Sequence, residues 1–153
     1  MKKEIKKVEV KKRVDAISLK NAYISILLTW LSVPLHSEKA RARNRIVEIL
    51  APRFKDFEKE RMELIEKYGE KDDKKKLIMI PGVNGGTRYS IKDQVKFNEA
   101  FDKIKEVEVV FDILPSNREN WKIARKIIED TKMEMDVEVT NIWEKVLEIL
   151  KEI

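Results

Sequence analysis

The stretch over residues 19–33 constrains the fold most, because it is apolar on nearly every side. Its large apolar side chains surround the helical circumference instead of forming one stripe; they are Tyr23, Ile24, Ile26, Leu27, Leu28, Trp30 and Leu31. In a soluble protein, neighbouring elements must cover most sides of such a helix. Ser18 is predicted as its N-cap, and Pro34 is expected to end it. We therefore predict a central helix that is covered either by the next helix or by another subunit.

The same stretch is too short to cross a membrane. The longest uncharged run, residues 21–37, has seventeen residues and contains Pro34, whereas a membrane-spanning helix needs about 18–20. Basic residues precede it, as in a secretory signal, but it lacks a small-residue cleavage site and leads directly into a charged helix. The sequence therefore predicts no contact with a membrane, and we expect a cytoplasmic location.

A second, long helix is predicted over residues 38–68. Ser37 supplies a hydroxyl cap and Glu38 an acid in the first turn. Apolar residues then recur at steps of three, four or seven along one stripe; they are Ile46, Leu50, Phe54, Phe57, Leu64 and Tyr68. Pro52 removes one backbone donor, so we expect a kink or a junction of two helices there. The short link before this helix predicts an antiparallel helical hairpin over residues 18–68.

The second half of the chain alternates between strand and helix patterns. Apolar runs at residues 77–80 and 88–91 flank Asn84-Gly85-Gly86, which predicts a β-hairpin. A phosphate-binding loop is the alternative, but the glycine spacings of such loops are missing. A helix over residues 92–105 follows, with Val95 and other apolar residues facing inward. An alternating strand comes next, carrying Val107, Val109, Phe111 and Ile113.

The last forty residues predict two more helices and a further strand. Ser116 and Glu119 form a capping box for a helix that carries Trp121. Residues 133–139 alternate between apolar and polar side chains, which is typical of a half-buried strand with an acidic outer face, although Met and Glu also tolerate a helix. Asn141 is expected to open a final helix.

These elements predict a single α+β domain over residues 1–153. It consists of an N-terminal antiparallel helical hairpin with a long kinked second helix, a small β-sheet that includes a β-hairpin, and C-terminal helices. Residues 1–15 are expected to form a basic arm or an edge strand, residues 18–68 the helical hairpin, and residues 76–153 the α+β part.

The composition removes most of the common catalytic and metal-binding groups. The chain has no cysteine and one histidine, His36, which excludes disulfides, thiol nucleophiles and zinc sites that need thiolate or a histidine pair. Glu134, Asp136 and Glu138 would stand about 6.6–6.8 Å apart along the predicted strand, a spacing more typical of a solvated edge than of a metal site. We therefore predict no catalytic residue, cofactor or metal, and no small-molecule substrate is evident.

Charge is distributed unevenly along the chain. Residues 1–98 carry 24 basic and 14 acidic side chains, whereas residues 99–153 carry 9 and 14, so the formal net charge of +5 hides a basic and an acidic part. The candidate phosphate contacts are Lys6, Lys7, Lys11, Lys12, Arg13, Lys39, Arg41 and Arg45. Arg41 and Arg45 share one helical face, while Arg43 points away. The alternative is a solvated surface, or attraction between this basic part and the acidic part.

Four short motifs occur in an order that resembles a family of small uncharacterised proteins of phages and prophages of Firmicutes. They are Glu-Lys-Tyr-Gly-Glu-Lys-Asp at residues 66–72, Tyr-Ser-Ile-Lys-Asp at 89–93, Phe-Asn-Glu-Ala-Phe at 97–101 and Glu-Val-Glu-Val at 106–109. The resemblance covers about residues 16–113. It implies a helical hairpin followed by a polar turn, a hairpin, a helix and a strand. It implies a phage or prophage origin and no particular reaction. The lean toward Lys, Glu and Ile is also the compositional bias of thermophiles.

The first hypothesis for function is a non-enzymatic phage or prophage accessory protein that acts by protein–protein contact in the host cytoplasm. Its partner would be another protein or a second copy of the chain, in a homo-oligomer. The candidate interface residues are Leu27, Trp30 and Leu31. The alternative is a nucleic-acid-binding module that uses the N-terminal arm and the helix face of Arg41 and Arg45.

Overall fold

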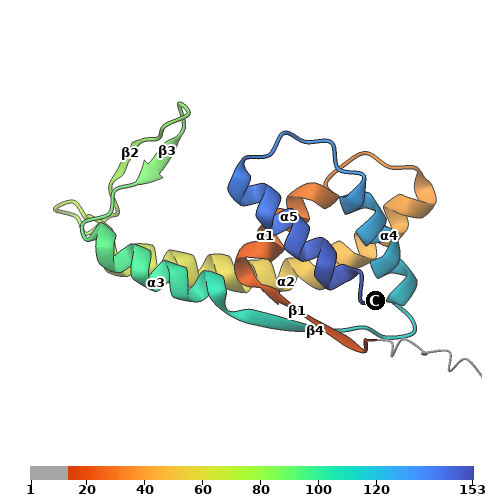
Figure 1. Cartoon of the computed structure of the whole chain (residues 1–153). Coiled ribbons are helices and arrows are strands. Elements are labelled where there is room, and N and C mark those ends of the chain that lie inside the picture. Colours follow the sequence, from red (N-terminus) through yellow and green to blue (C-terminus); the bar gives the residue numbers. More distant parts are fainter. Residues whose placement is uncertain (1–13) are drawn as a thin grey trace, which may run out of the picture.

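The computed structural model describes residues 14–153, in which helices and two small antiparallel sheets are combined (Figure 1). This mixture confirms the predicted α+β class. The predicted basic arm, with Lys6, Lys7, Lys11, Lys12 and Arg13, lies outside the described residues. Along the chain the elements are β1 (Ala16–Lys20), α1 (Asn21–Leu31), α2 (Ser37–Tyr68), β2 (Met79–Pro81), β3 (Thr87–Tyr89), α3 (Gln94–Glu106), β4 (Glu108–Asp112), α4 (Arg118–Glu129) and α5 (Val137–Leu150).

Helix α1 lies inside the hydrophobic core, as its apolar circumference requires. The chain's own side chains cover it. They come mainly from α2, α4 and α3. The core cluster to which α1 belongs includes Ile46, Leu50, Trp121, Ile128, Val146 and Leu150. Trp30 is 2% exposed and Leu31 0%. The second subunit that the sequence left open as a cover for α1 is therefore not needed for this purpose.

Helix α2 is one continuous helix that runs through the core and beyond it. Its 32 residues span about 48 Å at 1.5 Å per residue. Its buried residues are Ala42, Ile46, Leu50, Phe57 and Ile65. Ile46, Leu50 and Phe57 belong to the predicted stripe, whereas Phe54, Leu64 and Tyr68 are only half-buried. Pro52 lies inside this helix on the exposed side, so the predicted junction of two helices is wrong. Proline has no backbone N–H, so one carbonyl oxygen of the preceding turn loses its helical donor. On the exposed side of the helix, water can donate to that oxygen instead.

The second half of α2, the β2–β3 hairpin and α3 form a projection that we call the arm. Figure 1 shows it extending away from α1, α4 and α5. Phe101 joins α3 to α2 by stacking on Phe57, with ring centroids 5.8 Å apart, and it also stacks on Phe97 at 5.7 Å. Residues 79–81 pair antiparallel with residues 87–89, which confirms the predicted β-hairpin. Its turn contains Gly85 at a φ of 79°, a conformation that glycine adopts without strain.

The arm is tied to the core at the start of α1. Asn21 is buried, and its Nδ2 donates to the carbonyl oxygen of Ile104 in α3 at 2.8 Å, while its backbone N–H donates to Val107 at 3.0 Å. Lys20 Nζ donates to Glu106 Oε2 at 2.5 Å, and this hydrogen bond raises the pKa of Lys20 above its ordinary value. The end of α3 is thus held by both polar side chains at the β1–α1 junction.

The predicted N-cap of α1 is wrong, because Ser18 lies within a strand. Residues 16–20 form β1, which pairs antiparallel with β4, and Ser18 is opposite Val110. Ile17 and Phe111 are opposite each other and both buried, so this strand pair covers one side of the core. The alternation in residues 16–20 is too short to signal a strand, and its partner is about ninety residues later in the sequence.

The predicted strand over residues 133–139 is also wrong. Residues 131–136 are irregular, and α5 begins at Val137. Asp136 caps this helix, because its side chain accepts a hydrogen bond from the Val139 backbone N–H at 2.8 Å. The alternating residues 133–139 pair with no strand among the described residues. The capping bond of Asp136 instead starts a helix at Val137.

Two smaller predictions need correction. The helix expected from the Ser116–Glu119 capping box begins at Arg118 instead, and Asn117 Oδ1 accepts from the Leu114 backbone N–H at 2.8 Å. Val95, expected to face inward, is 67% exposed. It lies in the first turn of α3, on the side away from α2.

Removing the large aromatic side chain from the centre of the core tests this packing. Trp30→Ala is expected to lower the free energy of unfolding by about 3–5 kcal/mol, because it deletes a buried indole and leaves a cavity. Denaturant unfolding of both proteins measures the difference. Val95→Ala, at an exposed position, should change it by no more than about 0.5 kcal/mol. A Trp30→Ala protein with an unchanged unfolding midpoint would contradict the assigned core.

Candidate functional site

The basic residues predicted on the second helix lie at the beginning of α2, beside α4. Arg41 and Arg45 are exposed and share one hollow, as their spacing predicts; its other lining residues are Glu38, Ala42, Asn120 and Ile123. We call it the arginine hollow. Arg45 Nη1 lies 3.9 Å from Glu48 Oε2, and both side chains are well exposed, so this pair holds Arg45 only weakly. The two guanidinium groups therefore remain available to an anion.

Arg43 has a different role from its two neighbours. Its Nη1 donates to the carbonyl oxygens of Leu31 at 2.9 Å and Val33 at 2.7 Å. These carbonyls belong to the end of α1 and the link that follows, where a helix leaves acceptors without a partner. Arg43 thus fixes the α1–α2 link and is not a free basic group.

The candidate interface residues Leu27, Trp30 and Leu31 are not on the surface. They are 1%, 2% and 0% exposed and belong to the core cluster. The chain's own α2 and α4 pack against α1. The prediction that these three residues form a protein interface is therefore wrong for the folded chain. It rested on the apolar circumference of the helix, which the chain's own core covers at these three positions.

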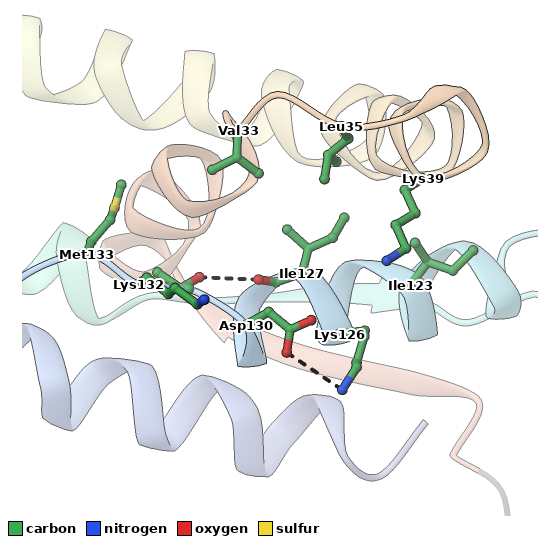
Figure 2. A pocket seen from close by; sticks show the side chains of 10 residues that line it. Val33, Leu35, Lys39, Ile123, Lys126, Ile127, Asp130, Lys132 and Met133 are labelled. Carbon is green, nitrogen blue, oxygen red and sulfur yellow. Dashed lines mark hydrogen bonds and ion pairs between the residues drawn. The ribbon is translucent and has the colours of Figure 1, made fainter.

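A pocket opens between the α1–α2 link and α4, and continues to the segment after α4 (Figure 2). We call it the lysine-rimmed pocket. Its volume is about 350 Å³. Its lining residues are Val33, Leu35, Lys39, Ile123, Lys126, Ile127, Asp130, Thr131, Lys132 and Met133. Figure 2 shows Val33 and Leu35 facing Ile127 across it. No periodicity signals such a pocket, because three separate segments build it.

Of the three lysines that line this pocket, Lys126 has acidic partners and the other two have none among the described residues. Lys126 Nζ lies 3.6 Å from Asp130 Oδ1 and 4.0 Å from Glu129 Oε2. Lys39 and Lys132 form no ion pair with any other described residue. Figure 2 shows the Lys39 side chain extending from α2 toward Ile123 on α4. The rim is therefore positive beside an apolar floor.

A second concentration of interaction-prone side chains lies on the arm. A hollow of about 330 Å³ separates the hairpin from α2 and α3, and we call it the arm hollow. Its lining residues are Arg61, Ile65, Met79, Thr87, Arg88, Tyr89, Ile91, Gln94 and Phe97. Arg61 is held by Glu58, with Nη2 and Oε2 3.0 Å apart. Arg88 forms no ion pair with another described residue, and its side chain is exposed.

The remaining titratable candidates do not come together. His36 is exposed at the cap position of α2 and makes no side-chain capping bond. Glu134, Asp136 and Glu138 are exposed in the segment before α5 and in its first turn, not along a strand. Within residues 14–153 no three side chains of His, Asp or Glu are grouped to hold a metal ion. In the same residues no helix is both long and apolar enough to cross a membrane.

No family model, curated protein or solved structure matches this chain. The resemblance to phage proteins therefore stays a prediction. Within residues 14–153 the candidate sites are the lysine-rimmed pocket, the arginine hollow and the arm hollow.

Substituting Arg43 and Arg41 separately tests whether Arg43 has a structural role that Arg41 lacks. Arg43→Ala is expected to lower the free energy of unfolding by about 1.5–3 kcal/mol, because two carbonyl acceptors lose a charged donor. Urea unfolding measures this loss. Arg41→Ala removes the same side chain from an exposed position of the same helix and should change stability by about 0.5 kcal/mol or less. Equal effects of the two substitutions would contradict the structural role of Arg43.

Proposed function

We propose that this chain is a non-enzymatic accessory protein of a phage or prophage that works by protein–protein contact in the host cytoplasm and associates with itself. The observation that carries the proposal is the arm hollow. It collects Met79, Tyr89, Phe97 and two arginines on a part of the molecule that projects from the core. Methionine, arginine and the aromatic residues are the side chains enriched at protein interfaces.

The arm also exposes apolar surface around this hollow. Met79 is 48% exposed, and Val83 at the hairpin turn is 98% exposed. Backbone hydrogen bonds join the base of the hairpin to the segment just after α2, because Ser90 N–H donates to Ile78 at 2.9 Å and Glu70 N–H donates to Ser90 at 2.8 Å. A preformed projection with exposed apolar side chains loses less conformational entropy on binding a partner than a disordered segment would.

The position of the arm favours contact over a structural role. Helix α3 contains no buried residue, so it contributes less to the core than α4, which has four. Large apolar side chains left outside a core are a feature of interaction surfaces. A second copy is the simplest partner, because one chain then supplies both sides of a symmetric contact.

Self-association can be measured directly by sedimentation velocity over a concentration series of the full chain. The wild-type protein is expected to form a dimer or larger oligomer, and Met79→Glu is expected to shift it toward monomer by placing a charge in the contact. Val137→Glu makes the same kind of change at a position that is 79% exposed on α5 and should leave the oligomer unchanged. A wild-type protein that is monomeric at every concentration would overturn self-association.

Nucleic-acid binding is the second candidate, and the arginine hollow favours it. Arg41 and Arg45 lie on one exposed face at the start of α2 and face Asn120 and Ile123 of α4. Two free guanidinium groups on one surface can contact neighbouring phosphates, and the affinity then falls steeply with salt.

A gel-shift series at low salt, with a labelled duplex and a labelled single strand, separates this candidate from a solvated surface. The double variant Arg41→Glu and Arg45→Glu is expected to abolish a shift that the wild-type chain produces. Lys55→Glu with Lys59→Glu has the same spacing on the same helix, at exposed positions, and should retain it. Absence of any shift with the wild-type chain would remove nucleic acid as a partner.

A further inference from the structure

We propose that the lysine-rimmed pocket binds a small amphipathic anion, an unbranched aliphatic chain that ends in one carboxylate. The aliphatic chain would lie between the α1–α2 link and α4, and the carboxylate would meet an ammonium group of the rim, that of Lys39 at the end near Ile123 or that of Lys132 at the end near Met133 (Figure 2). The pocket belongs to the core and not to the arm, so this inference is independent of the proposed self-association.

The shape and lining of the pocket suit a small molecule. Its volume of about 350 Å³ falls within the range of roughly 300–1,000 Å³ for small-molecule sites, which are mostly apolar with a few placed polar groups. Val33 and Leu35 form one wall and Ile127 the opposite one, while Met133 closes the end near Val33 (Figure 2). These walls are aliphatic and contain no aromatic ring, so they favour a flexible alkyl chain over a planar group.

The polar groups specify the charge of the ligand. Three ammonium groups and one carboxylate line the pocket, and that carboxylate, Asp130, is already paired with Lys126 at 3.6 Å. Lys39 and Lys132 are left without an acidic partner among the described residues. An anion at this rim would gain a charge-assisted contact with an unpaired ammonium group, whereas a cation would be repelled.

The arrangement also explains why the anion should carry an apolar chain. An exposed lysine alone attracts any anion weakly, because water screens the charge. Here the aliphatic stem of Lys39 extends along the same apolar floor that the ligand's chain would cover (Figure 2). The ligand therefore removes apolar surface from water and brings its carboxylate to an ammonium group in one step.

The test uses octanoate, with octan-1-ol, octylamine and acetate as matched probes of charge and chain. Methyl spectra of the full chain report where each probe binds, and calorimetry reports its dissociation constant. Octanoate is expected to shift the methyl signals of Ile123, Ile127 and Met133, and to bind at least tenfold more tightly than the alcohol, the amine or acetate. The methyl signals of Ile65 and Ile78 on the arm should not move.

Lys39→Ala with Lys132→Ala should weaken octanoate binding about tenfold and leave octan-1-ol binding unchanged, since both lysines are exposed and the apolar walls remain. Lys55→Ala with Lys59→Ala, at exposed positions on the same long helix as Lys39, should leave both unchanged. Equal affinity for octanoate and octan-1-ol, or shifts spread over the arm, would overturn the proposal. So would shifts of the pocket methyls that appear on raising the protein concentration without octanoate, because a second copy would then fill the pocket.

Discussion

The burial of most of α1 is the constraint on which the rest of the structure depends. An eleven-residue helix with apolar residues around its circumference cannot lie at the surface of a small protein, so the other elements must surround it. Helix α2 covers one side, α4 and α3 cover others, and the β1–β4 pair closes the core with Ile17 and Phe111. Because this covering comes from the same chain, Leu27, Trp30 and Leu31 are closed to a second subunit, and the side of α1 with Ser25, Leu28 and Thr29 borders an open hollow.

Because α1 ends inside the protein, carbonyl oxygens at its end need hydrogen-bond donors, and Arg43 supplies them. The last carbonyls of a buried helix must find donors, and the link to α2 is too short to fold back over them. Arg43 reaches the carbonyl oxygens of Leu31 and Val33 from the next helix, and in doing so it fixes the position of Val33. The same bond that satisfies the helix end thus supports one wall of the lysine-rimmed pocket. The pocket follows from how α1 ends, together with the turn of chain after α4.

The sequence predicts what depends on long local patterns and misses what depends on partners far away. The stripe on α2 and the glycine turn of the hairpin act over neighbouring residues, so both were predictable. The pairing of Ser18 with Val110 joins segments about ninety residues apart, and Asp136 overrides an alternating pattern with one capping bond. For the candidate sites, the spacing of Arg41 and Arg45 predicts their shared face. The lysine-rimmed pocket was unpredictable because Val33, Ile127 and Met133 meet only in the folded chain.

A single helix carries residues of both proposed binding regions. Lys39 lies near the start of α2 and Arg61 in its second half, about 33 Å apart at 1.5 Å per residue. Two ligands at that separation do not touch, so the pocket and the arm can be occupied together. They also differ in chemistry: the pocket is aliphatic with an unpaired basic rim, whereas the arm hollow presents methionine, tyrosine and arginine. A small anion would suit the first, and a protein surface, which supplies many weak contacts at once, would suit the second. The two proposed ligands would therefore bind at separate parts of one helix and would not compete.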